Sequence, residues 1–456
     1  MDSSPITSPD LPVVIIGAGP IGLAAHLARR DEPFLMLEAG SSTAASVREW
    51  AHVTLFTPWR YDVDTEARTL LEETGWTMPD PLAYPTGAEL VHAYLDPLAQ
   101  HPAIAPHVRV QHRVTAIAHE AISKTERGRE EDPFLVYVTT PAGDDVIVAR
   151  AVIDASGAWS NPNPIGANGL PVPGERALQA HIQYRVPDVA GADRNRYLGK
   201  RVLVVGSGHS ALNALQDLVT LATEDSATQP IWALRRETST RALAACADDP
   251  LTERTLVKKD VREMLEQGGI SAYGNVRISQ LSETPDGIVA WSGNYPLPPV
   301  DEVIVATGFR PDLSIERELQ LDLHPVFESA RGLAPIIDPD ANACGTVPPH
   351  GVRELAHPEP DFFVVGMKSY GRAPTFLLLT GYEQVRSVVA SLVGDASALE
   401  VQLDLPEKGL CSACTAFLED REAGVACGCG SDDADPDDAC CVPTSDATET
   451  TAMAAV

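Results

Sequence analysis

The sequence has 456 residues, with 64 acidic and 34 basic side chains and a formal net charge of −30. This charge argues against nucleic acid or an anionic membrane surface as a partner, because both would repel the protein. No apolar run approaches the ~18 residues of a membrane span, and residues 1–10 lack the charged and apolar regions of a signal peptide. We therefore expect a cytoplasmic protein with a disordered N-terminus, and the length predicts two or three domains.

The first motif is an apolar strand followed by a glycine-rich turn. Residues 13–16 are all β-branched, which is typical of a buried parallel strand. Gly17, Gly19 and Gly22 then match the GxGxxG pattern, and a helix over about residues 21–29 would point its N–H groups at a pyrophosphate. A second apolar strand over residues 34–37 ends in Glu38, at the spacing typical of an acid that binds ribose hydroxyls. The pattern predicts a dinucleotide site.

Residues 41–100 are inserted before the next strand signals. Trp50, Thr57 and Pro58 lie in an aromatic-rich loop, which either packs over the sheet edge or forms a wall over a planar cofactor. Thr86 and Glu89 have the spacing of a capping box, which predicts a helix that ends near residue 98.

A group of short strands follows. Residues 108–110, 114–118, 134–139 and 146–148 have strand patterns and predict a small antiparallel meander, with the charged residues 124–132 at a hairpin tip. A strand over residues 151–154 then leads to a small-residue turn that contains Gly157. The Asn-Pro-Asn-Pro stretch at 161–164 breaks regular structure and indicates a crossing between domains.

The second dinucleotide motif follows a strand over residues 201–205. Gly206, Gly208 and Ala211 match GxGxx(G/A), and His209 and Ser210 would begin the next helix. An apolar strand over residues 303–305 later ends in a small-residue turn that contains Gly308 and returns the chain to the first domain.

Two arginines distinguish this second motif from the first. The strand over residues 231–234 ends in Arg235 and Arg236 instead of an acid, and Arg241 follows. Guanidinium groups at this place suit a 2′-phosphate, so we expect NADPH rather than NADH. The alternative is a solvated basic pair.

The last segment is acidic and rich in cysteine. Residues 401–456 contain twelve acidic and two basic residues, and we expect this tail to be largely disordered or loosely docked. Cys411 and Cys414 have the Cys-x-x-Cys spacing of a redox pair. A four-sulfur zinc site is the alternative, although its spacing is unusual for zinc and suits arsenic(III) or mercury better; incidental thiols are a third possibility. The candidate metal or metalloid ligands are Cys411, Cys414, Cys427, Cys429, Cys440 and Cys441.

The chain resembles the flavin-containing monooxygenases over most of its length. The resemblance rests on the two glycine motifs, the loop that contains Trp50 and Thr57, residues 84–95 and the Ala-Thr-Gly-Phe stretch at 306–309. It implies an α/β fold of two Rossmann-like dinucleotide-binding domains. The implied bounds are 1–10 for the N-terminus, 11–165 and 305–395 for an FAD-binding domain, 166–304 for an NADPH-binding domain that interrupts it, and 396–456 for the flexible tail.

The resemblance also implies which residues bind FAD and NADPH. The expected cofactor-binding residues are Gly17, Gly19, Pro20, Gly22, Glu38, Trp50, Thr57, Pro58, Gly157, Gly206, Gly208, His209, Ser210, Arg235, Arg236 and Gly308.

Three residues are expected to act in catalysis. Residues 172–184 are similar to a signature that the family carries between its two sites, although Val172 replaces the usual Phe and the spacing departs from the Baeyer–Villiger form. This signature makes His181 a linker residue that positions the nicotinamide. Lys368 and Arg372 precede a long helix over about residues 375–392. They would form an electropositive spot beside the flavin, and the alternative is that they are surface charges.

The resemblance implies an FAD- and NADPH-dependent oxidoreductase, and we expect a monooxygenase. Oxygen would react with reduced flavin to give a C4a-(hydro)peroxide, which oxygenates a small soft nucleophile that carries sulfur, nitrogen or trivalent arsenic. Residues 368–372 and the tail are similar to flavin monooxygenase-like proteins of actinobacterial arsenic-resistance operons. The resemblance also implies a homodimer.

Two alternatives stay open. The domain pair also resembles low-molecular-weight thioredoxin reductases, but the nicotinamide domain offers only Cys246 where these carry Cys-x-x-Cys. A thiol or metalloid reductase would therefore pass electrons to the tail cysteines. The other alternative is a metalloid-binding or nucleotide-sensing flavoprotein with little turnover.

Overall fold

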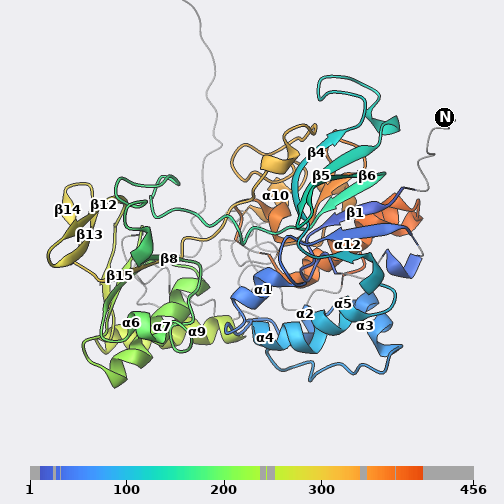
Figure 1. Cartoon of the computed structure of the whole chain (residues 1–456). Helices are drawn as coiled ribbons and strands as arrows, with labels where there is room; N and C mark the ends of the chain where they lie inside the picture. Colours follow the sequence, from blue (N-terminus) through green and yellow to red (C-terminus); the bar gives the residue numbers. More distant parts are fainter. Residues whose placement is uncertain are drawn as a thin grey trace, which may run out of the picture.

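The computed structural model describes residues 11–23, 27–30, 32–236, 243, 252–338, 347–374 and 376–403. Two parallel sheets of five strands each form the centres of two bodies, which lie side by side in Figure 1. This α/β architecture agrees with the fold class expected from the sequence. Both glycine motifs follow a strand in the interior of a sheet, so each turn lies at the carboxyl edge where such folds bind ligands.

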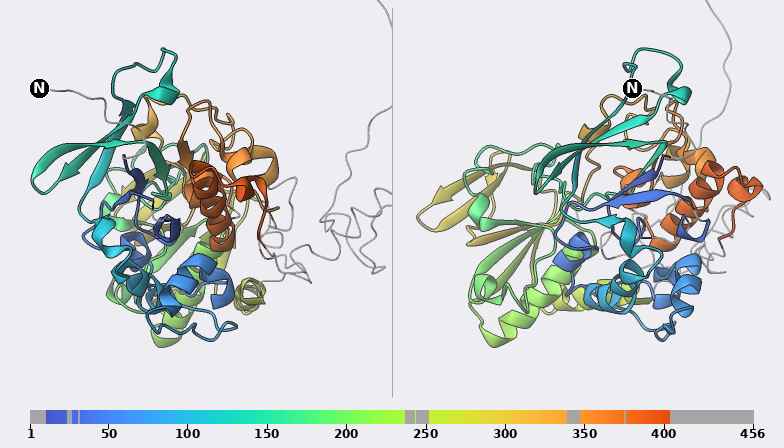
Figure 2. Two further views of the ribbon diagram at one scale, coloured as in Figure 1. Left: turned by 90° about the vertical axis from the view of Figure 1, so that its right-hand side faces the viewer. Right: turned by 45° about the vertical axis from the view of Figure 1, so that its right-hand side comes forward.

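The first sheet has the strand order β16-β7-β1-β2-β3. Its two faces are covered differently, because successive side chains of a strand point to opposite faces. Val13 and Ile15 of β1 pack in a core with α12, whereas Val14 and Ile16 pack against the meander β4-β5-β6. Figure 2 shows α12, in orange-red, against this first body. The strands are β1 Val13–Ile16, β2 Phe34–Leu37, β3 Val108–Arg109, β7 Ala151–Asp154, β16 Phe362–Val364, β4 Arg113–His119, β5 Phe134–Thr140 and β6 Gly143–Ala149.

The second sheet has the order β11-β10-β9-β15-β8. Val202 and Val204 of β9 pack in a core with α7, and Leu203 and Val205 pack in another core with the small sheet β12-β13-β14. The strands are β8 Ile182–Tyr184, β9 Arg201–Val205, β10 Gln229–Ala233, β11 Ser271–Tyr273, β15 Glu302–Val305, β12 Ile278–Thr284, β13 Gly287–Ser292 and β14 Tyr295–Pro296.

Most of the described helices are short. The capping box of Thr86 and Glu89 is formed, and one π-helical turn, Val91–Leu95, joins α4 to α5. The α-helices are α1 Ala45–Glu49, α2 Trp59–Asp62, α3 Thr65–Glu72, α4 Gly87–Leu90, α5 Asp96–Gln100, α6 Arg194–Tyr197, α7 His209–Glu224, α9 Thr252–Glu266, α10 Ala334–Ile337, α11 Val352–Leu355 and α12 Leu378–Leu392. No helix in the described ranges is long and apolar enough to span a membrane.

Two chain segments cross between the bodies side by side. The Asn163 N–H donates to Gly308 O at 2.9 Å, and the Arg310 N–H donates to Asn161 O at 3.2 Å. The Asn-Pro-Asn-Pro stretch therefore pairs with the chain that returns after β15.

Two expectations are corrected. The helix expected over about residues 21–29 falls partly outside the described residues: residues 21–23 form a turn, in which Leu23 N–H donates to Gly19 O at 3.0 Å, and Ala28–Arg30 form a 3-10 turn. The strand β3 belongs to the parallel sheet and not to the meander, because the chain turns at Gln111, whose φ is +56°. Residues 396–399 are not part of a loose tail, since Ser387 Oγ donates to Ala398 O at 2.6 Å and holds them on α12.

Candidate functional site

The first glycine turn is closed by backbone contacts and open at one point. Gly17 has a φ of +95°, and a Cβ there would lie 2.8 Å from Ala155 O. A Cβ at Gly22 would lie only 1.9 Å from Gly17 O. At Gly19, by contrast, a Cβ would meet nothing within 4 Å. Gly17 and Gly22 therefore allow close backbone contacts within the turn. The open space at Gly19 fits the close approach of a pyrophosphate.

Glu38 fixes the ribose side of this turn. Its Oε2 accepts a hydrogen bond from Ala18 N–H at 3.0 Å, and its Oε1 accepts one from Gly40 N–H at 2.7 Å. Each carboxylate oxygen has two lone pairs, so each can accept a further bond. The residues therefore fit the adenosine ribose and pyrophosphate of FAD.

The aromatic-rich loop is tied to the capped helix. A Cβ at Gly87 would lie 2.7 Å from the Trp50 ring, and Leu55 N–H donates to Pro85 O at 2.8 Å. The Trp50 ring therefore packs on the start of α4. Its contact with a cofactor, like that of Thr57 and of Pro58 before α2, stays a prediction.

A buried carboxyl group lies behind this loop, and sequence reasoning missed it. Asp62 is fully buried; its Oδ1 accepts a bond from Thr57 Oγ1 at 2.6 Å, and its carbonyl oxygen accepts one from Tyr382 Oη at 2.8 Å. No described residue bonds the other carboxyl oxygen, Oδ2. Burial raises the pKa of Asp62 to about 7, although the Thr57 hydroxyl lowers it. The group can therefore hold or release a proton near neutral pH. The only indication of this group in the sequence is an aspartate a few residues after Pro58.

The second glycine turn has the same construction. Gly206 has a φ of +135°, and a Cβ there would lie 2.2 Å from Ala306 O in the small-residue turn after β15. Gly208 begins α7 and is open within 4 Å, and no side chain caps the first N–H groups of this helix of 16 residues. The backbone N–H groups of this first turn, at His209 and Ser210, can donate hydrogen bonds to a phosphate.

Two arginines follow β10. Arg235 and Arg236 are exposed at the carboxyl edge of the sheet. No carboxylate of the described residues forms an ion pair with either of them. Their position fits the 2′-phosphate of NADPH. Arg241 lies outside the described residues.

The aromatic loop also touches the second body. The Phe56 ring lies 5.3 Å from the His209 ring, measured between centroids. Farther along α7, burial raises the pKa of Asp217 to about 6, while the nearby His52 lowers it. The loop of the first body therefore packs against α7, the helix that begins within the second dinucleotide motif.

The expected electropositive spot at Lys368 is wrong. The Lys368 side chain is buried, and its Nζ lies 2.7 Å from both Asp154 Oδ2 and Glu316 Oε1. Burial raises the pKa of Glu316 to about 8, and Asp154 adds to the increase while Lys368 opposes it. Burial would lower the pKa of Lys368, but the two carboxylates hold it above its usual value. The lysine charge is therefore compensated within the core. Arg372 lies at the surface, 2.9 Å from Glu328 Oε1, so its charge is paired as well.

His181 does not lie near the second glycine turn. It precedes β8 at the amino end, and its Nδ1 is 3.2 Å from Glu302 Oε1. In the parallel register Ile182 is level with Leu203, so Gly206 is about four residues, or roughly 13 Å, farther along the sheet. His181 therefore lies away from the turn that would bind the pyrophosphate, and its role in placing the nicotinamide stays a prediction.

The family comparison agrees with this geometry. A family model described as pyridine nucleotide-disulphide oxidoreductase matches residues 14–340, which contain both glycine turns. The chain belongs to this family. It is an oxidoreductase, and membership in the pyridine nucleotide-disulphide oxidoreductases together with the two turns supports FAD and NADPH as its cofactors.

Solved structures share this fold. The bacillithiol disulfide reductase Bdr from Bacillus cereus has a TM-score of 0.63 and 16% identity, and the match covers 84% of this chain and 99% of that chain. A variant of a flavin monooxygenase from Stenotrophomonas maltophilia has a TM-score of 0.54 and 24% identity, with 84% and 98% covered. An ornithine N-hydroxylase from Kutzneria has a TM-score of 0.55 and 16% identity, with 85% and 99% covered.

A curated relative matches only a part of the chain. The indole-3-pyruvate monooxygenase YUCCA1 from rice, Oryza sativa subsp. japonica, is 29% identical over 211 residues, which are 45% of this chain and 44% of that protein. The chain thus spans less than half the length of this relative.

The candidate metal site lies outside the described residues. This holds for all six cysteines of the tail and also for Cys246 and Cys344. In the part of the chain that the structure describes, no group of three or more His, Cys, Asp or Glu side chains could hold a metal ion.

Proposed function

We propose that this protein is a flavin monooxygenase that uses NADPH and oxygen to oxygenate a small soft nucleophile carrying sulfur, nitrogen or trivalent arsenic. The observation that carries this proposal is the pair of glycine turns, each at the carboxyl edge of its own parallel sheet, in a chain whose residues 166–304 contain a single cysteine, Cys246. One cysteine cannot form the redox-active disulfide that a reductase of the thioredoxin type needs in this domain. The monooxygenase and N-hydroxylase folds among the similar structures support the same choice.

The residues of the chain would bind and orient the two cofactors. In the first body, Gly19 gives the FAD pyrophosphate access to the backbone, and Glu38 accepts hydrogen bonds from the ribose. In the second, the first turn of α7 binds the NADPH pyrophosphate, and Arg235 with Arg236 binds its 2′-phosphate. Bound flavin supplies a hydride acceptor and the means to activate oxygen. Asp62 can hold a proton close to neutral pH behind the loop that faces α7.

The proposal also covers the domain bounds, the location and the oligomeric state. We propose residues 11–165 and 305–395 for FAD binding, residues 166–304 for NADPH binding, a cytoplasmic location and a homodimer. The role of the tail in capturing arsenic(III) is part of this proposal and rests on its six cysteines.

A thiol or disulfide reductase is the second candidate. The name of the family and the fold shared with bacillithiol disulfide reductase favour it. In that case, electrons would leave towards the tail cysteines, with Cys411 and Cys414 as the first pair.

Rapid mixing separates the two candidates. The purified yellow protein is reduced with NADPH without oxygen and then mixed with oxygenated buffer while the flavin spectrum is recorded. A transient spectrum unlike both oxidised and reduced flavin is expected for the monooxygenase, and its decay should accelerate with an arsenite, thioether or amine substrate. Direct reoxidation would contradict the proposal.

A truncation tests the reductase. A variant without residues 404–456 should keep its NADPH-dependent turnover if the protein is a monooxygenase. Loss of turnover with disulfide acceptors, together with direct reoxidation in the full chain, would establish the second candidate instead.

A further inference from the structure

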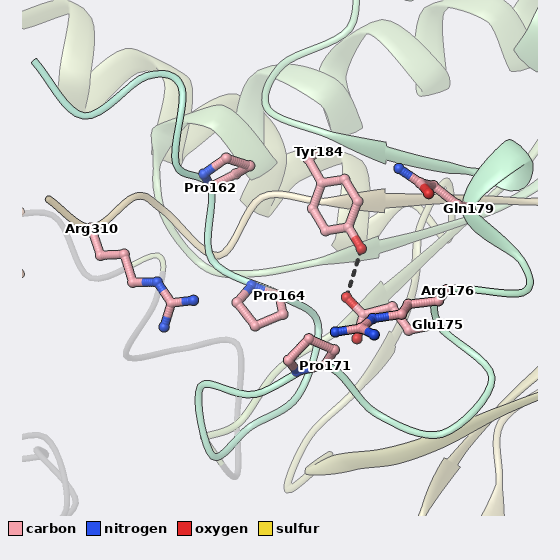
Figure 3. Close-up of a pocket in the computed structure, with 8 residues that line it drawn as sticks. All are labelled: Pro162, Pro164, Pro171, Glu175, Arg176, Gln179, Tyr184 and Arg310. Carbon is pink, nitrogen blue, oxygen red and sulfur yellow. Dashed lines mark hydrogen bonds between the residues drawn. The ribbon is translucent and has the colours of Figure 1, made fainter. Parts of the chain in front are cut away.

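A pocket of about 360 Å³ lies where the chain crosses between the two bodies. A cleft of this size is within the range of ~300–1,000 Å³ that accommodates small molecules. Half of its lining residues lie in the signature segment, residues 172–184 (Figure 3), and none of them is assigned to either proposed dinucleotide site. The lining residues are Pro162, Pro164, Pro171, Glu175, Arg176, Gln179, Tyr184 and Arg310.

The one acidic side chain of the lining, Glu175, binds the walls of the pocket together. Glu175 is 1% exposed, and its carboxylate accepts three hydrogen bonds. The donors are Ile165 N–H at 3.0 Å, Val172 N–H at 2.8 Å and Tyr184 Oη at 2.6 Å; Figure 3 shows the last of these. Glu175 therefore ties the crossing segment to the signature segment and to β8, and it forms no ion pair with either arginine of the described lining.

The two arginines of the lining have N–H groups that donate to no described residue. A guanidinium has five N–H donors. Arg310 is half-buried and uses one of them, from Nη1, on Gly169 O at 3.3 Å. Arg176 is exposed, and no described residue accepts a hydrogen bond from it. Two cations with unused donors therefore line a pocket whose only carboxylate is engaged elsewhere.

Apart from the Gln179 amide, the other described walls are three prolines and the Tyr184 ring. The three prolines have no N–H to donate, and their rings fix the backbone. The Tyr184 hydroxyl points to Glu175, so its ring is the surface it can offer a ligand. Walls of this kind suit a compact, flat, apolar body, and the arginines suit a carboxylate attached to it.

The Tyr184 wall of the pocket and α7 lie on opposite faces of the second sheet, at the carboxyl edge where Tyr184 is level with Val205. Tyr184 packs on the core shared with β12 and β13, whereas α7, which would take the NADPH pyrophosphate, packs in the core on the other face. We propose that this pocket binds a small aromatic or alicyclic carboxylate, separately from both dinucleotides. The proposal does not depend on whether the enzyme is a monooxygenase or a reductase.

Ligand-observed fluorine NMR on the FAD-loaded, full-length protein tests this proposal. The probes are 4-fluorobenzoate and its neutral counterpart 4-fluorobenzamide. We expect 4-fluorobenzoate to bind at least tenfold more tightly than the amide, and R310Q and R176Q each to weaken it several-fold and together to abolish it. R113Q is the control, because Arg113 is an exposed arginine on β4 of the other body. Circular dichroism shows whether the variants stay folded.

Four results would overturn the proposal. They are equal binding of the acid and the amide, no binding of either, unchanged binding of 4-fluorobenzoate to a folded double variant, and its displacement by saturating NADP⁺. Failure of the oxygenation experiment leaves these NMR measurements unaffected, so the two proposals can fail separately.

Discussion

Replacement of Lys368 by Met should destabilise the first body strongly. At pH 7 the cluster is neutral overall, because Lys368 is positive, Asp154 is negative, and Glu316, with a pKa raised to about 8, is mostly protonated. The variant leaves the Asp154 carboxylate in the core, where it is 0% exposed, with Ser156 N–H as a donor at 2.9 Å but no cation. Removal of one partner from a buried ion pair typically lowers the free energy of unfolding by about 3–5 kcal/mol, and we expect a loss of this size.

The pH dependence gives a second signature. Without Lys368, burial should raise the pKa of Asp154 above that of an unfolded chain, so the folded variant binds a proton more tightly than the unfolded one. Its stability then falls as the pH rises towards that folded pKa. The deficit relative to the wild type should therefore shrink on acidification, by at most about 1.4 kcal/mol per pH unit.

The assay is urea-induced unfolding, followed by circular dichroism at pH 6 and pH 8 and at one fixed FAD concentration, because bound cofactor itself adds stability. The double variant K368M/D154N removes both charges and should recover most of the loss. A deficit below about 1 kcal/mol, far under the expected range, would refute the assignment of a compensated buried charge, as would a deficit that the double variant does not reduce.

The remaining predictions concern the carboxyl group behind the loop and the two dinucleotide sites. The pKa of Asp62 is raised to about 7, so the wild type loses stability as the pH rises towards 7; D62N should remove this slope, and parallel urea midpoints for the two proteins between pH 5 and pH 8 would contradict it. R235A/R236A should raise the KM for NADPH about tenfold or more with little change for NADH, since charge-assisted bonds to the 2′-phosphate are lost; steady-state kinetics with both coenzymes decides. G22A should give protein without bound FAD, because its Cβ would lie 1.9 Å from a carbonyl oxygen, whereas G19A should fold and only bind FAD more weakly. Equal flavin content in the two purified variants would show that the turn does not hold FAD in this way.

Much of the fold follows from patterns that are local in the sequence. The β-branched strands, the glycine turns after them, the capping box at Thr86 and Glu89, and the helix after Gly208 all depend on neighbouring residues, and the structure has each of them. The same is true of Glu38 and of the arginines after β10, because the length of a βαβ unit fixes their distance from the glycine turn.

The expectations that failed concern contacts between distant parts of the chain. Nothing near Lys368 indicates that it meets Asp154, 214 residues earlier, and Glu316. The signature segment predicts that His181 positions the nicotinamide, but the parallel register of β8 puts this residue at the amino end of the sheet, away from the glycine turn. The pocket at the crossing likewise depends on Arg310, which pairing across the two crossing segments brings beside residues 162–184.

The sequence by itself determined the two glycine turns, each after a buried parallel strand, and the positions of the acid and the arginines that follow them, because backbone conformation and the spacing within one βαβ unit are local properties. Only the tertiary structure decided which charges are compensated, which carboxyl group is buried behind the aromatic loop, and which end of a sheet a residue occupies. Burial and pairing are set by residues that are hundreds of positions apart, and no local pattern encodes them.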